Sequence, residues 1–278
     1  MPPAWRIFHR DLQLRPLGQV CAGSRFDHQG ALRYDAPVVD PATLRPRSPR
    51  WPRPERCLIA VANYGRRGTA VPCITQLSST RGAATLWLYD DCSPDFEPGD
   101  WEGLVDRVIR APHNRGINAC RMQNLRDFWA SDFEFLYMTD NDAFHDPDWL
   151  LVARQLYARW RLPVTLFDSV FHQELRGLGP GARLKRSFPG ISLFLDRASA
   201  ARVLTVYDVG DSRGGPFRPW SSWDWVYGEI LGNCIVTSIP SRVDHYGAGG
   251  LHNHDNEVDQ AQHPTPFLAQ VRAERRFG

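Results

Sequence analysis

The sequence predicts an α/β domain in which a mostly parallel sheet is flanked by helices. From Cys57 onward, short apolar runs alternate with stretches of helical spacing, which is the pattern of βαβ units. Runs such as "CLIAVA" at residues 57–62 are apolar at successive positions, as strands covered on both faces should be. With 278 residues, of which 42% are hydrophobic, the chain can fill the core of one such domain.

The apolar runs give the expected elements in order. Strands are expected at 57–62, 84–89, 133–138, 163–169 and 190–196, and helices at 119–131, 148–160, 197–207 and 224–233. Segment 103–112 fits either a helix or a strand. Asp196 stands where the helix that follows it needs an N-cap, and Gly232 stands near the end of the last helix.

A change in composition sets the boundaries of the domain. Residues 1–56 are expected to form an irregular N-terminal extension, because Pro and Arg are concentrated in "PATLRPRSPRWPRPER" and no regular period persists there. The domain is expected at 57–255, with a first half at 57–147 and a second half at 148–255. Residues 256–278 are polar and are expected to be a C-terminal arm.

Charge and composition exclude several classes of protein. The formal net charge is +2 and Lys185 is the sole lysine, so no partner is inferred from charge. No apolar run approaches the roughly twenty residues of a transmembrane helix, and the N-terminus lacks the apolar core of a signal peptide, so a cytoplasmic protein is expected. The cysteines form no C-x-x-C pair and are expected to be reduced, structural thiols: Cys21, Cys57, Cys73, Cys92, Cys120 and Cys234.

Polar side chains follow three of the predicted strands directly. Asn63 ends the first, Asp90 and Asp91 end the second, and Asp140 and Asp142 end the third. In an open α/β sheet, ligands bind beyond the carboxyl ends of the strands, so these side chains are expected to line one crevice. At extended spacing, the two carboxylates of the D-x-D pair leave the backbone on the same side.

The acidic stretch "YMTDNDAFHDPDW" at 137–149 predicts a metal site. Two carboxylates this close repel each other unless a cation offsets them, and Mg²⁺ or Mn²⁺ uses one or two carboxylates together with substrate phosphates. Asp140 and Asp142 are therefore interpreted as a seat for a metal and its diphosphate. Asp146 or Asp148 is interpreted as a helix N-cap, and His145 as a solvated turn residue, with a metal ligand as the alternative.

Several segments together resemble the nucleotide-sugar half of GT-A-fold glycosyltransferases, in particular family 2 and its relatives. They occur in the family's order and approximate spacing: "AVANYG", "VPCITQLSS", "LWLYDDCSPD", "NRGINACRMQNL" and "FEFLYMTDNDAFHDPDWL". The resemblance covers roughly residues 57–250. It implies a Rossmann-like GT-A sheet and a hexosyl- or pentosyltransferase that uses a nucleoside-diphosphate sugar and Mn²⁺ or Mg²⁺.

The resemblance also implies roles for individual residues. A first group would contact the nucleotide-sugar, with Asp140 at the ribose: Asn63, Tyr64, Asp90, Asp91, Arg121 and Asp140. Asp142 would hold the metal that bridges the two phosphates. Cys92 replaces the usual Gly of Asp-Asp-Gly-Ser, which makes a positive φ costlier at that turn and leaves the choice of base open.

The second half supplies candidates for the chemistry. An inverting transfer needs a general base for the acceptor hydroxyl, and Asp224 in "PWSSWDWVYGEILG" resembles the acidic residue that such enzymes keep ahead of a helix; Glu229 is the alternative. The neighbouring Trp rings could support a sugar face. In "PSRVDHYG", His245 resembles the late His that completes the metal shell, with His252 and His254 as alternatives. The glycines at 247, 249 and 250 would let a loop pass close to the diphosphate.

Two other functions share part of this pattern. A nucleotidyltransferase would need a Gly-rich loop ending in Arg and Lys, and "NYGRRGTAVP" after the first strand has no Lys. A non-catalytic nucleotide- or glycan-binding module would lack the base. The acceptor stays open among a glycan, a lipid-linked sugar, a small molecule, a protein and a hydroxylated base in nucleic acid, and the Arg-rich extension keeps a polyanion in consideration.

Overall fold

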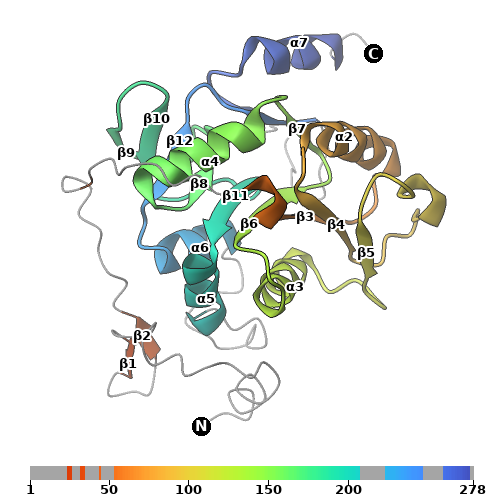
Figure 1. Cartoon of the computed structure of the whole chain (residues 1–278), viewed down its shortest axis with the longest axis horizontal. Helices are drawn as coiled ribbons and strands as arrows, with labels where there is room; N and C mark the ends of the chain where they lie inside the picture. The colour runs from red at the N-terminus through yellow and green to blue at the C-terminus, as the bar shows by residue number, and fades with distance from the viewer. Residues whose placement is uncertain are drawn as a thin grey trace.

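A computed structural model describes residues 53–206, 223–246 and 259–275 (Figure 1). It also describes Leu44 and two short strands that pair antiparallel, β1 (Ser24–Phe26) and β2 (Leu32–Tyr34). Both strands fall in the extension that was expected to be irregular. The alternative ligands His252 and His254, and the glycines at 247, 249 and 250, lie outside the described residues.

The core of the molecule is a nine-stranded sheet with the order β5-β4-β3-β6-β11-β8-β12-β10-β9. Its strands are β3 (Cys57–Asn63), β4 (Thr85–Asp90), β5 (Arg107–Arg110), β6 (Phe135–Asp140), β8 (Val164–Thr165), β9 (Glu174–Gly177), β10 (Ala182–Lys185), β11 (Ser192–Asp196) and β12 (Ile235–Ser238). Only β10 and β11 run against the other strands of this sheet. The prediction of a mainly parallel α/β sheet is therefore confirmed, and segment 103–112 contributes a strand.

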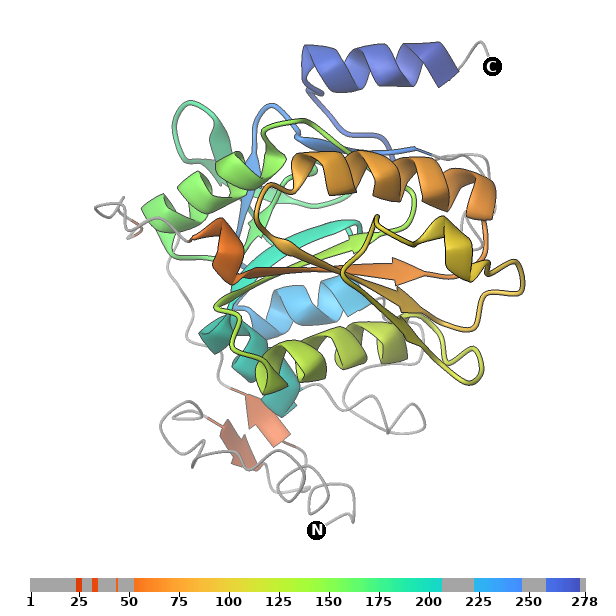
Figure 2. The same ribbon diagram turned by 45° about the vertical axis from the view of Figure 1, so that its right-hand side comes forward.

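Helices cover both faces of the sheet, as the continuous apolar runs required (Figure 2). On one face, Ile59 and Val61 of β3 belong to a core shared with α2 (Arg67–Thr80) and α4 (Trp149–Trp160). On the other face, Leu58 and Ala60 share a core with α3 (Ile117–Ala130), α5 (Arg197–Val206) and α6 (Trp223–Ile230). Within the described ranges, no helix combines the length and the apolar character needed to cross a bilayer.

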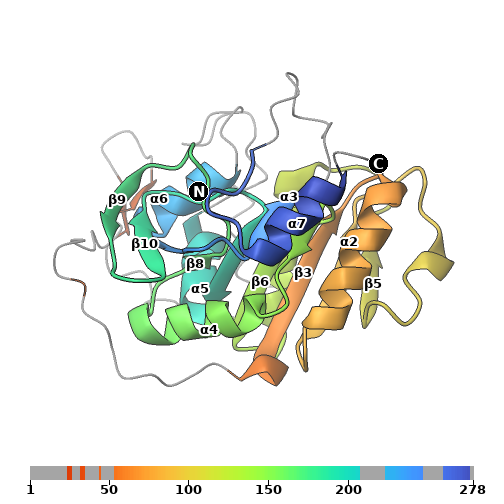
Figure 3. The ribbon, with the colours of Figure 1, turned by 90° about the horizontal axis from the view of Figure 1, so that it is seen from above.

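A further two-stranded sheet follows the end of β6. It pairs β7 (Ala143–His145) with β13 (Val243–His245), so that Ala143 faces His245 across the ladder. The predicted C-terminal arm contains a helix, α7 (Pro266–Arg275), which lies between α4 and α2 in the view of Figure 3. Arg272 of this helix pairs with Asp244 of β13 at 2.5 Å, and this ion pair ties the end of the chain to the small sheet.

The cysteines of the described residues are all free thiols. Cys57, Cys73, Cys120 and Cys234 are buried, and Cys92 is partly exposed. Burial raises the pKa of Cys57 and Cys120 to about 12, so both stay protonated and unreactive near neutral pH. The expectation of structural thiols is confirmed for these residues, and Cys21 lies outside the described residues.

Candidate functional site

Hydrogen bonds between side chains join the carboxyl ends of β3, β4 and β6. The Asn63 amide nitrogen donates to Asp90 Oδ1 at 2.8 Å, and the Asn63 amide oxygen accepts from Asn141 Nδ2 at 2.8 Å. All three side chains are buried. The strand ends that the sequence predicted to meet do meet, and Asn141, the residue between the two aspartates of the D-x-D pair, is part of the connection.

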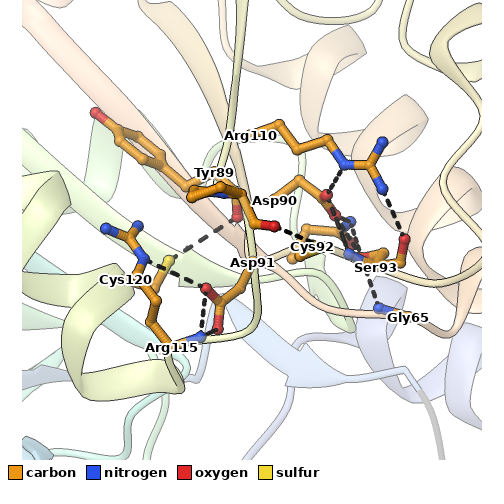
Figure 4. A network of polar contacts seen from close by, with 11 residues as sticks. Gly65, Tyr89, Asp90, Asp91, Cys92, Ser93, Arg110, Arg115 and Cys120 are labelled. Carbon is orange, nitrogen blue, oxygen red and sulfur yellow. Dashed lines mark hydrogen bonds and ion pairs between the residues drawn. The ribbon is translucent and has the colours of Figure 1, made fainter.

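Asp90 shapes the turn after β4 (Figure 4). Its buried carboxylate accepts the backbone N–H of Ser93 at 3.1 Å and the Ser93 hydroxyl, and it pairs with Arg110 Nε at 3.1 Å. Within this turn, Cys92 has φ 63°, the left-handed conformation that was expected to be costly without glycine. The Asp90 carboxylate is thus enclosed by groups of the protein itself.

Asp91 orders the loop before α3 in a similar way (Figure 4). Its oxygens accept the backbone N–H groups of Arg115 at 2.9 Å and of Gly116 at 2.7 Å. A carboxylate that receives two backbone N–H groups fixes the local path of the chain. Both aspartates therefore hold the backbone at the carboxyl ends of the strands, while Tyr64, next to Asn63, is partly exposed.

Asp140 forms an ion pair with a buried arginine, Arg121. The Arg121 side chain of α3 is 0% exposed, and its Nη2 donates to Asp140 Oδ1. The same guanidinium donates to the Thr139 carbonyl at 3.0 Å and lies over the Trp223 ring at 4.7 Å. The sequence suggested that Arg121 touches a nucleotide; the structure places it beneath Asp140, whose side chain is 29% exposed and forms the surface of the site.

The surroundings of Asp140 bring the remaining candidates together. Although its side chain is 29% exposed, desolvation by the protein packed around it raises the pKa of Asp140 to about 6, and Arg121 opposes this increase. The carboxylates of Asp142 and Asp224 add to the increase, and His245 opposes it. Residues from β6, α3, α6 and β13 therefore all influence the pKa of Asp140, although more than a hundred positions of sequence separate the first from the last.

The β7–β13 ladder places His245 next to the D-x-D pair. His245 is opposite Ala143, the residue after Asp142, and the Tyr246 N–H donates to the Asp142 carbonyl at 2.5 Å. The His245 ring nitrogen Nδ1 is 2.7 Å from the Asp259 carbonyl. A carbonyl can only accept, so Nδ1 carries the proton and the lone pair belongs to Nε2, the arrangement usual for a metal-binding histidine.

Asp142 and His245 could hold a divalent cation whose other ligands come from substrate phosphates and water. Among the described residues, no group of three His, Cys, Asp or Glu side chains is arranged to hold a metal ion. Asp142 and His245 form an oxygen and nitrogen pair, and the Asp142 carboxylate also receives Arg66 Nη1 at 2.8 Å. Mg²⁺ and Mn²⁺ sites commonly have one or two protein ligands and take the rest from substrate phosphates and water.

Asp224 lies in the first turn of α6, next to Trp223, whose ring contacts Arg121. Asp224 is 8% exposed, and its Oδ1 accepts the N–H of Trp225 at 2.9 Å, which fixes the side chain at the start of the helix. Trp225 is 46% exposed, and its ring stacks on His172 at 5.0 Å. Glu229, the alternative base, is exposed on the same helix, so only Asp224 is enclosed near Asp140.

The expectation for His145 is wrong. His145 is 0% exposed instead of solvated, and its Nε2 lies 3.0 Å from the Tyr137 hydroxyl. Burial lowers its pKa to about 3, so the ring is neutral. Asp146 and Asp148 are structural, as expected, although they act by pairing with Arg242 at 3.2 and 2.7 Å instead of by side-chain capping of α4.

Sequence reasoning missed three residues of this site: Asn141, Arg66 and His172. Asn141 lies inside the D-x-D motif. Its position between two predicted site residues was the signal in the sequence that could have identified it. Arg66 follows the first strand in "NYGRRG", but the partner of an arginine cannot be read from its position. His172 lies in a segment without period, and nothing in the sequence pairs it with Trp225.

Comparisons with known proteins give partial structural matches. No family model and no curated protein sequence matches the chain. S. aureus TarS (residues 1–349) matches over 65% of this chain and 57% of that chain, with 14% identity and a TM-score of 0.44. Glucosyl-3-phosphoglycerate synthase from Mycobacterium tuberculosis, in complex with Mn²⁺, UDP and glucosyl-3-phosphoglycerate, matches over 39% of this chain and 42% of that chain, with 15% identity and a TM-score of 0.33.

A second structure of the mycobacterial enzyme, with Mn²⁺, UDP and phosphoglyceric acid, matches to the same extent. The chain thus spans about half the length of the solved structures it matches. These matches are similarities to GT-A glycosyltransferases over part of the fold. At this identity and TM-score they say nothing about a donor or an acceptor, which must come from the residues of the site.

Proposed function

We propose that the protein is a metal-dependent glycosyltransferase that moves a sugar from a nucleoside-diphosphate sugar to a hydroxyl acceptor with inversion. The observation that supports this most is the arrangement around Asp140. The β7–β13 ladder sets His245 opposite the residue after Asp142, and Arg121, the partner of Asp140, lies over the ring of Trp223, the neighbour of Asp224. The carboxylates of Asp140, Asp142 and Asp224 repel one another, so the arrangement requires additional positive charge and a hydrogen-bond donor beside them. A donor diphosphate with its cation on one side, and an acceptor on the other, meets that requirement.

On the donor side, some residues support the ends of the strands and others would contact the donor. The strand ends are held in place by Asn63, Asp90 and Asp91. Tyr64 is partly exposed beside them and would contact the nucleotide. Asp140 faces the ribose, and Arg121 positions it from below. Asp142 and His245 would hold Mn²⁺ or Mg²⁺, which when bound stabilises the charge on the leaving diphosphate.

On the acceptor side, Asp224 removes the proton of the attacking hydroxyl. The acceptor oxygen forms a bond to the anomeric carbon while the bond from that carbon to the diphosphate oxygen breaks, and the proton goes to the carboxylate. The hydrogen bond from the Trp225 N–H holds the Asp224 side chain in one orientation. Its proximity to Asp140 keeps the base next to the donor instead of in bulk solvent.

The first test is nucleotide binding. A panel of nucleoside diphosphates with Mn²⁺ is expected to contain one member that raises the melting temperature by about 5–10 °C at a hundred times its Kd. Asp142→Asn is expected to remove the Mn²⁺-dependent part of the shift. Asp148→Asn, an acidic residue six positions on that is 45% exposed and paired with Arg242, is the matched control and should keep it. Equal shifts in the two variants would refute the metal role.

Trp225 offers a platform for the acceptor. A half-exposed indole beside the proposed base, backed by a buried His172 ring, matches the apolar face of a sugar ring. Trp225→Ala is expected to raise the acceptor KM about tenfold and to leave donor hydrolysis unchanged, whereas Trp225→Phe keeps most of the affinity. Steady-state kinetics with varied acceptor measure this, and an unchanged KM in Trp225→Ala would rule the platform out.

The two alternatives have less support. A nucleotidyltransferase would need a lysine in the turn after β3, and the chain's sole lysine, Lys185, lies instead at the end of β10, paired with Asp168 at 2.5 Å. A non-catalytic binding module would not turn over. Donor hydrolysis with and without Mn²⁺ separates this module from an enzyme, because only the enzyme releases free sugar faster in the presence of the cation.

A further inference from the structure

Arg66 reaches from the turn after β3 to the end of β6. It precedes α2 and has φ 59° and ψ 39°, a left-handed conformation that is unusual for a residue with a side chain. Its Nη1 donates to Asp142 Oδ2 at 2.8 Å, and the two side chains are 22% and 15% exposed. The pair joins segments that are 76 positions apart in the sequence.

The backbone next to Arg66 is held by hydrogen bonds, while its side chain extends to Asp142. The Gly65 N–H donates to Ser93 Oγ at 2.8 Å, and the Gly65 carbonyl accepts from Asn141 Nδ2 at 3.2 Å. These bonds tie the turn to the ends of β4 and β6. A change in the position of the guanidinium would therefore be a rotation of the side chain and would leave the turn in place.

A guanidinium and a divalent cation compete for one carboxylate. When Arg66 occupies an Asp142 oxygen, a cation at the same group meets a like charge a few ångströms away. The described residues contain no third His, Cys, Asp or Glu grouped with Asp142 and His245 that could compensate. Asp142 is thus indispensable to the proposed metal seat, and it already has a positively charged partner.

We propose that Arg66 is a tethered counter-cation for Asp142 that yields this carboxylate to the divalent cation only when a nucleoside diphosphate binds with it, and then pairs with the diphosphate. The inference rests on the proposed function and adds to it an order of events at the same site. A guanidinium matches two phosphate oxygens as well as it matches a carboxylate, so Arg66 exchanges one anionic partner for another. The cation and the nucleotide therefore strengthen each other's binding, by the same factor in both directions.

The test begins with Mn²⁺ alone, titrated into the full chain and followed by the EPR signal of free Mn²⁺. Arg66→Asn tolerates the left-handed backbone and removes the charge, so it is expected to bind Mn²⁺ about tenfold more tightly than the wild type. Arg66→Lys restores a charge and should return to weak binding. Arg66→Gly, which is at ease with positive φ, gives a second neutral variant should Arg66→Asn fail to fold.

Arg67→Asn is the matched control. It changes the same residue type by the same charge one position away, but the Arg67 side chain pairs with Asp100, 2.7 Å from Nη2 to Oδ1, on the outside of the turn. It should bind Mn²⁺ as the wild type does. With Mn²⁺ saturating, Arg66→Asn should bind the nucleoside diphosphate several-fold more weakly than Arg67→Asn, because it has lost the partner of the diphosphate.

The outcomes separate this inference from the proposed function. Equal Mn²⁺ affinity in Arg66→Asn and Arg67→Asn, or weaker affinity in Arg66→Asn, overturns the role of Arg66 even if the wild type binds nucleotide. A wild type that binds none of the nucleoside diphosphates, with or without Mn²⁺, overturns the proposed function and the inference together. Tighter Mn²⁺ binding combined with weaker nucleotide binding in Arg66→Asn supports both.

Discussion

Asp224→Asn is expected to lower kcat about a thousandfold, the range over which a positioned general base contributes to a reaction. The amide keeps the size of the side chain, and its oxygen can still accept the Trp225 N–H, so the start of α6 should be unchanged. The amide cannot accept the proton of the acceptor hydroxyl. Mn²⁺-dependent nucleotide binding should stay within about twofold, so the loss appears in kcat and not in the donor KM.

Glu229→Gln is the control for this prediction. Glu229 is on the same helix but exposed, and its substitution should leave kcat unchanged. Steady-state rates with a saturating donor measure both variants, and the anomeric configuration of the product is read from the same reaction. A kcat within about tenfold of the wild type in Asp224→Asn would contradict its role as the base. Retention of configuration in the product would contradict the inverting mechanism.

Arg121→Met is expected to lower the free energy of unfolding by about 3 kcal/mol, the range for removing one partner of a buried ion pair. Arg121 is 0% exposed, and without it Asp140 would face the carboxylates of Asp142 and Asp224 with its ion-pair partner lost. Met fills a similar volume, so the loss reflects the missing charge and hydrogen bonds more than a cavity. Urea unfolding curves of the two proteins give the difference.

The double variant Arg121→Met/Asp140→Asn identifies the cause of that loss. If the unpaired Asp140 carboxylate is responsible, neutralising it should recover about half or more of the stability. Recovery below the error of the extrapolation would mean that Arg121 acts mainly through its bonds to the Thr139 carbonyl and the Trp223 ring. In that case Arg121 would be a packing residue and would not position Asp140.

The parts of the fold that the sequence could predict are those fixed by short-range pattern. "CLIAVA" is apolar at every position and "FEFLYM" at every position except Glu134, and the structure buries β3 and β6 on both faces. Asp196 caps α5 as expected, through a bond from the Ser199 N–H at 2.8 Å. Because parallel strands end at one edge, the meeting of Asn63, Asp90 and Asp140 followed from the order of the strands.

The elements that were missed have a weaker local signal. Helix α2 buries Ala70, Cys73, Ile74 and Leu77 at helical spacing, but Pro72 inside it weakens the sequence signal for a helix. Strands β9 and β10 form a hairpin at the sheet edge, and β9 has no buried residue to give it an apolar pattern. Among the described side chains of helix α7, Leu268 is the one that is buried, at 1% exposed, so the helix has a weak apolar pattern.

Within the site, the sequence could point to carboxylates but not to their partners. The D-x-D motif singled out Asp140 and Asp142. The structure pairs Asp140 with Arg121 of α3 and Asp142 with Arg66 of the turn before α2. Such pairs depend on the packing of distant segments, which no local period encodes. His145 was misjudged for the same reason, since its burial against Tyr137 follows from the β7–β13 sheet.

The account depends on one divalent cation that Asp142 and His245 share with a nucleoside diphosphate. Pulsed EPR of Mn²⁺ in the ternary complex tests this most directly, because nuclei bound to the ion couple to its electrons. We expect a ³¹P coupling from the diphosphate together with a ¹⁴N coupling from a histidine, and we expect His245→Gln to remove only the nitrogen signal. A complex with the phosphorus coupling and no nitrogen coupling in the wild type would contradict the site described above.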